Sequence, residues 1–116
     1  MPESALVALS LDHAYQAFES MLVRLERVLG LPARAGSEWH GAVLADATLD
    51  LPDVRPAVVA TEHHRDWADL LAFRHFLRHA YTVELDAEKL VKNVTSLGRA
   101  VDGTEPRVVA LLASLG

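Results

Sequence analysis

Two arginines and two histidines fall within six consecutive residues of this chain, Arg74, His75, Arg78 and His79. At about 100° per residue of helix, with Arg74 at zero, Arg78 lies near 40°, His75 near 100° and His79 near 140°. The apolar residues of the same stretch fill the rest of the wheel. The spacing therefore predicts a helix with one apolar side facing the core and one basic side facing solvent.

Those residue types suit cleavage at a phosphate. The guanidinium group of arginine offers a fixed fork of donors that matches a phosphate and stays charged at any working pH. Histidine exchanges a proton near neutrality, so it can act as a general base or acid. RNA carries its own nucleophile, the 2'-hydroxyl, beside each phosphate. An enzyme that cleaves RNA then needs a base, an acid and a cation for the developing charge. The pattern favours a ribonuclease that requires neither a metal nor another cofactor.

Two other interpretations fit the same residues. Basic side chains on a helix are most often a solvated face without a chemical role. His75 and His79, four residues apart, could also bind a metal from one side of the helix. No carboxylate on the neighbouring turns completes such a ligand set, and the His-Glu-x-x-His motif is absent. We therefore expect no metal site.

The elements that must position these side chains are helices. Apolar residues recur every three to four positions over about residues 4–29, where Gly30 and Pro32 end the pattern. A second helix is predicted over 37–49 with Ser37 as its N-cap, and a third from near Pro56 to about residue 81. Asp86 caps a fourth helix, which Gly103 interrupts before a short last one over 104–115. We expect an all-α bundle of four to five helices with mostly antiparallel neighbours.

The length and composition of the chain limit the classes of protein to which it can belong. The 116 residues fit a single domain, 1–116, and hydrophobic residues make up 51% against 6% aromatics, which favours an aliphatic helical core. The chain has no cysteine, no apolar run long enough to span a bilayer and no basic leader, so a cytoplasmic protein without a membrane partner is expected. The net charge of -5 means that any nucleic-acid site must be a local basic patch.

The stretch from Arg74 to Tyr81 resembles the signature of HEPN ribonucleases, in which an arginine and a polar residue precede three further residues and a histidine. Tyr81, two places after His79, makes the chain similar to the HepT-like toxins, which pair with small nucleotidyltransferase antitoxins. The resemblance covers about residues 11–97, and its specific part is residues 74–81. It implies a HEPN-like helical domain that acts as the ribonuclease toxin of a toxin–antitoxin pair.

The resemblance also implies a role for each residue. Arg74 would neutralise the scissile phosphate, and His79 would act as general base or acid. His75 stands where the family most often has asparagine and would orient the phosphate, while Arg78 is an additional charge that supports substrate binding. Tyr81 matches the tyrosine to which the antitoxin adds adenylyl groups (AMPylation).

The sequence also leads to an expected oligomeric state and to an alternative function. HEPN domains of this kind form two-fold homodimers that bring two motifs into one cleft, so a homodimer with the third helices near the axis is expected. The alternative to a toxin is a non-catalytic subunit that presents a nucleotide or a substrate to a partner nucleotidyltransferase. An intact Arg74 and His79 pair favours the ribonuclease, because a scaffold has no need of that pair.

Overall fold

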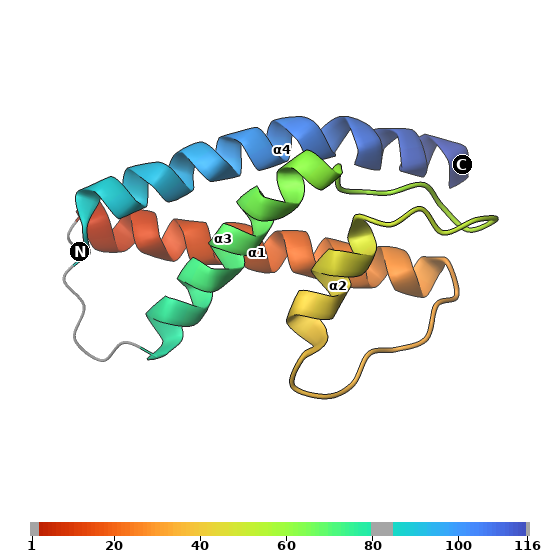
Figure 1. Cartoon of the computed structure of the whole chain (residues 1–116), viewed down its shortest axis with the longest axis horizontal. Helices are drawn as coiled ribbons and strands as arrows, with labels where there is room; N and C mark the ends of the chain where they lie inside the picture. Colours follow the sequence, from red (N-terminus) through yellow and green to blue (C-terminus); the bar gives the residue numbers. More distant parts are fainter. Residues whose placement is uncertain (1–2, 80–84, 116) are drawn as a thin grey trace.

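The structure is a computed structural model, and it describes residues 3–79 and 85–115. Four helices make up this part of the chain: α1 (Glu3–Val28), α2 (Trp39–Ala47), α3 (Thr61–His79) and α4 (Ala87–Leu115). The long helices α1 and α4 lie side by side and run in the same direction, and α3 crosses them on its way back (Figure 1). The short α2 lies against α1. The expected all-α bundle is confirmed, but α1 and α4 are parallel neighbours where antiparallel ones were expected.

The core is built where α1, α3 and α4 meet. Phe18 of α1 stacks on Trp67 of α3, with ring centroids 3.6 Å apart and planes 2° from parallel. The indole Nε1 of Trp67 donates a hydrogen bond to Thr104 Oγ1 of α4 at 3.0 Å, so its polar atom is satisfied inside the core. The buried apolar residues of α1 follow the spacing seen in the sequence, and they include Leu11, Tyr15, Phe18, Leu22 and Leu25. The stacking of Phe18 on Trp67 fixes how α3 crosses α1.

The predicted start of α3 is wrong by five residues, since the helix begins at Thr61. The backbone N–H groups of Val58 and Val59 both donate to the carbonyl of Ala47, at 2.9 and 3.0 Å. Both valines are buried, and they form a bend that packs against the end of α2. Tertiary contacts therefore place these apolar residues in the core as a loop, and the helix starts only after them.

A side chain that the sequence does not single out adds to the hydrogen bonds at the end of α2. Arg55 is 7% exposed and donates hydrogen bonds to the carbonyl oxygens of Asp46, Leu49 and Pro56 at 3.0–3.1 Å. Helix carbonyls near the C-terminus lack partners within the helix, and a cation is favoured there. At the other end, the predicted cap is wrong: α2 begins at Trp39 without a side-chain cap.

The predicted break at Gly103 is also wrong, because α4 continues through Pro106 to Leu115. Gly103 faces the His63 ring of α3 so closely that a Cβ there would force this ring to move. The glycine therefore serves a close helix approach, and packing on α1 and α3 outweighs the hydrogen bond lost at the proline. Asp86 does cap this helix, as predicted, since its Oδ1 accepts from the backbone N–H of Glu88 at 2.9 Å. No helix in the described part is long and apolar enough to cross a bilayer.

Candidate active site

The basic residues of α3 do not share one solvent-facing side. His75, Arg78 and His79 are exposed, whereas Arg74 is only 9% exposed and lies beside the buried Phe73. The expectation that all four basic groups face solvent is therefore wrong for Arg74. The buried stripe of α3 is wide because this helix contacts both α1 and α4.

Arg74 is buried because a carboxylate from α1 pairs with it. Its Nε donates to Asp12 Oδ1 at 2.9 Å, and the two side chains are 10% and 18% exposed. The other nitrogens of the guanidinium group form no hydrogen bond with any described residue. An arginine held through Nε keeps its terminal N–H groups for a bidentate contact with an anion. Asp12 thus positions Arg74 without using the donors that a phosphate would need.

His79 lies in the last described turn of α3, and its ring lies beside that of His75 with centroids 4.4 Å apart. His79 follows Arg74 by five positions, which corresponds to about 140° around the helix and about 7.5 Å along it. The buried arginine and the exposed imidazole therefore leave the helix in different directions. One copy of the chain does not place both groups on the same side of this helix.

Two further expectations concern Tyr81 and metal binding. Tyr81 lies outside the described residues, so the structure gives no position for it. Within residues 3–79 and 85–115, no three His, Asp or Glu side chains are grouped in a way that could hold a metal ion. His75 and His79 are thus a pair without a third ligand from the described chain.

Tyr15 is a buried polar residue next to this site that sequence reasoning missed as a site residue. It is 1% exposed, and its hydroxyl has no hydrogen-bond partner among the described residues. Burial raises the pKa of Tyr15, Glu19 raises it further, and the nearby Arg74 lowers it. The Tyr15 hydroxyl is therefore neutral, and it lies close enough to Arg74 for the guanidinium charge to affect its pKa. The only sequence signal was its place three residues after Asp12 in the first helix.

Three carboxylates repeat every seven residues along α1, and each one pairs with a basic side chain from another element. Seven residues are about two helical turns, so the three lie on one face of α1. The pairs are Asp12 with Arg74, Glu19 with His40 at 2.8 Å, and Glu26 with Arg34 at 2.6 Å. One side of α1 therefore carries the candidate arginine at one end and the contacts of α2 at the other.

These features define a class: an all-α bundle whose third helix carries an anchored arginine and, five residues later, an exposed histidine. A family model described as "HepT-like protein" matches residues 6–115. The chain belongs to this HepT-like family of the HEPN superfamily, and the family suggests a toxin–antitoxin context. No curated protein and no solved structure matches the chain.

Proposed function

We propose that this protein is the toxin of a toxin–antitoxin pair and a metal-independent endoribonuclease acting in the cytoplasm. The observation that carries the proposal is the anchoring of Arg74. Its Nε is held by Asp12 while its terminal nitrogens have no described partner, on a helix that also carries the exposed His79. The terminal nitrogens are not among the buried unpartnered atoms of the described residues, so an anion can reach them from solvent.

The proposed reaction is transesterification by the substrate's own hydroxyl. The terminal N–H groups of Arg74 bind the non-bridging oxygens of the scissile phosphate and stabilise the charge that develops on them. The imidazole of His79 takes the proton of the 2'-hydroxyl, whose oxygen attacks phosphorus. The bond from phosphorus to the 5'-oxygen breaks, and an imidazolium gives that oxygen a proton. The products are a 2',3'-cyclic phosphate and a 5'-hydroxyl end, with His75 and Arg78 orienting the strand.

The proposal includes a homodimer with the α3 helices near the two-fold axis. Within one chain, Arg74 and His79 leave α3 in different directions, and a single His79 cannot be base and acid at the same moment. A second copy supplies another imidazole and another guanidinium group to the same cleft. Sedimentation at micromolar concentration should give a dimer, and a strict monomer would contradict this arrangement.

Cleavage of RNA by the purified protein tests the activity. His79→Ala should lower the cleavage rate by about 10²–10⁴-fold, because it removes a proton-transfer group from an exposed position. Arg74→Lys should lower it comparably, because lysine keeps the charge but not the fork of donors. Arg65→Ala, an exposed arginine of the same helix, is the matched control and should cleave like wild type.

Cleavage should also be unchanged by EDTA. Loss of cleavage on chelation would establish a metal-dependent reaction instead. Wild-type rates in the His79→Ala variant would remove this residue from the mechanism.

We further propose that the partner is a nucleotidyltransferase antitoxin that adenylylates Tyr81. A bulky anion at this position, close in sequence to Arg74 and Arg78, would compete with RNA phosphate for their donors. Co-expression with the partner should add adenylyl mass increments that the Tyr81→Phe variant lacks. An unmodified toxin that is inhibited in a stable complex would exclude this mechanism in favour of steric blockade.

A further inference from the structure

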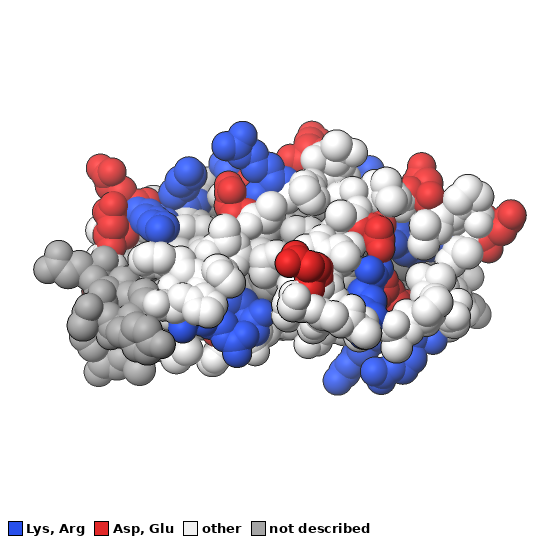
Figure 2. All heavy atoms as spheres, turned by 60° about the horizontal axis from the view of Figure 1, so that its bottom comes forward, with Lys and Arg blue, Asp and Glu red and all other residues white. Residues whose placement is uncertain are grey.

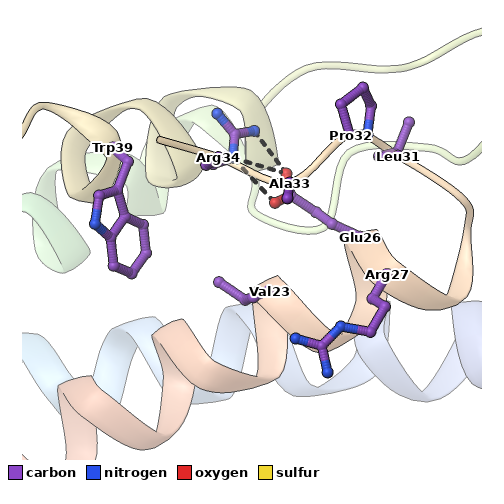
Figure 3. A pocket seen from close by; sticks show the side chains of 8 residues that line it. All are labelled: Val23, Glu26, Arg27, Leu31, Pro32, Ala33, Arg34 and Trp39. Carbon is purple, nitrogen blue, oxygen red and sulfur yellow. Dashed lines mark hydrogen bonds and ion pairs between the residues drawn. The ribbon is translucent and has the colours of Figure 1, made fainter. Parts of the chain in front are cut away.

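Two adjoining hollows lie along α1 beneath the start of α2. Their volumes are about 360 and 310 Å³, and both are lined by Val23, Arg27 and Trp39. The first extends toward Leu31 and Pro32 and the second toward Arg24. In Figure 3 the Trp39 side chain reaches from α2 toward Val23 on α1, while Pro32 lies on the opposite side. We call this pair of hollows the Trp39 groove.

The indole that forms one wall of the groove is held in place. Trp39 is half-buried and stacks on the His40 ring, with centroids 3.9 Å apart. His40 Nδ1 in turn pairs with the buried Glu19 carboxylate of α1 at 2.8 Å. A flat aromatic ring fixed beside a small hollow is the kind of surface on which nucleobases stack.

Two arginines at the groove have no ion-pair partner within residues 3–79 and 85–115. Glu26 accepts two hydrogen bonds from Arg34 Nε and a third from its Nη2, so this carboxylate of the first hollow is paired. Asp46 pairs with the same guanidinium group, so these three side chains together keep one negative charge. Arg24 and Arg27 are exposed and form no ion pair with any described residue. Figure 2 shows basic side chains gathered over the C-terminal half of α1, apart from those near α3.

The groove lies on the same side of α1 as the candidate active site. Asp12, which anchors Arg74, is seven residues before Glu19 and 11 before Val23, and both of these line the groove. At 1.5 Å per residue, Val23 lies about 16 Å along the helix from Asp12. A single strand of about 4–16 nucleotides fills the binding groove of a typical single-strand-binding fold, so one strand can reach both places.

We propose that the Trp39 groove binds a nucleotide of the single-stranded RNA substrate a few positions away from the cleaved phosphate. The base packs against Trp39, and Arg24 and Arg27 bind the flanking phosphates. This inference rests on the proposed ribonuclease function and adds a substrate subsite to it. It also explains how a chain with a net charge of -5 holds RNA, since the contact needs only local arginines.

Binding of an uncleavable RNA tests the groove separately from catalysis. The probe is a fluorescein-labelled 2'-O-methyl oligonucleotide of about ten nucleotides, which lacks the attacking hydroxyl, and binding is followed by anisotropy over a range of salt concentrations. The Arg24→Gln/Arg27→Gln variant should bind at least about tenfold more weakly. Its slope of log Kd against log salt should fall by about 1.4, the value for two lost phosphate contacts on a single strand.

The matched control removes the same charge elsewhere. Arg65→Gln/Lys92→Gln changes two exposed residues of α3 and α4 that do not line the groove, and it should keep the wild-type slope. Trp39→Leu should weaken binding by about 5- to 100-fold, whereas Trp39→Phe should retain most of it, because any aromatic ring can stack on a base. Thermal melting of each variant confirms that it is folded.

The possible outcomes distinguish failure of the RNA subsite at the Trp39 groove from failure of the proposed ribonuclease activity. If Arg24→Gln/Arg27→Gln binds the probe with the affinity and slope of the control, the groove is not an RNA subsite. If that variant instead loses binding to a nucleotidyltransferase partner alone, the groove is a protein-docking surface and the inference is likewise overturned. Wild-type protein is assayed in parallel for cleavage of unmodified RNA. Groove-dependent binding without cleavage would refute the ribonuclease and leave the RNA subsite standing.

Discussion

A double-mutant cycle on Asp12 and Arg74 tests whether the candidate arginine is anchored inside the fold. The four proteins are wild type, Asp12→Ala, Arg74→Ala and the double variant. The hydrogen bond between the two side chains is 2.9 Å long, and their exposures are 18% and 10%, so water screens the pair only in part. A hydrogen bond between charged groups contributes about 1.5–3 kcal/mol, and an exposed ion pair about 0–1 kcal/mol. We expect a coupling free energy of about 1.5–3 kcal/mol.

The single variants should show the cost of an unpaired charge. Removing one partner of a fully buried pair costs about 3–5 kcal/mol, and the residual exposure here reduces this to about 2–4 kcal/mol for Asp12→Ala. The free energies of unfolding come from urea titrations followed by far-ultraviolet circular dichroism. Arg65→Ala, an exposed arginine of α3, should change stability by less than about 0.5 kcal/mol. A coupling energy below about 0.5 kcal/mol would mean that Arg74 behaves as a solvated surface residue, and the anchoring argument would fail.

Two further predictions concern the packing of α3 on α4. Gly103→Ala would place a Cβ against the His63 ring, which must move to make room, and should cost about 1–3 kcal/mol in urea unfolding, whereas Gly98→Ala, with open space, should stabilise by up to about 1 kcal/mol. Burial alone would raise the pKa of Asp66, but hydrogen bonds from Arg99 and His63 outweigh it and lower that pKa. Because the folded pKa is the lower one, this stabilisation is present above about pH 3.9 and is lost as the pH falls through the folded value. Asp66→Asn should remove that part of the acid sensitivity, and an unchanged pH profile of unfolding would contradict it.

The helices themselves could be predicted from the sequence because their signals are local. The apolar residues of α1 recur at the spacing of one helix face, and the helix matches the predicted bounds to within one residue at each end. The Asp86 cap was predictable for the same reason, since its acceptor and its donor are two residues apart. The group of basic residues at 74–79 and its resemblance to the HEPN signature could likewise be recognised from the sequence.

Only the tertiary structure decided which of those basic groups is buried. The wheel placed Arg74 on the basic side, but its partner Asp12 lies 62 residues away in the sequence, and no local pattern connects them. The same holds for Arg55, whose donors complete the end of α2 from a loop. At Gly103 a residue that ends helices in isolation lies inside α4, because the His63 ring occupies the space where a side chain would be. Local propensity sets which secondary structure each segment favours. Contacts between distant segments override that preference at some positions, because burying apolar surface and pairing a buried charge contribute more free energy than the local propensity does.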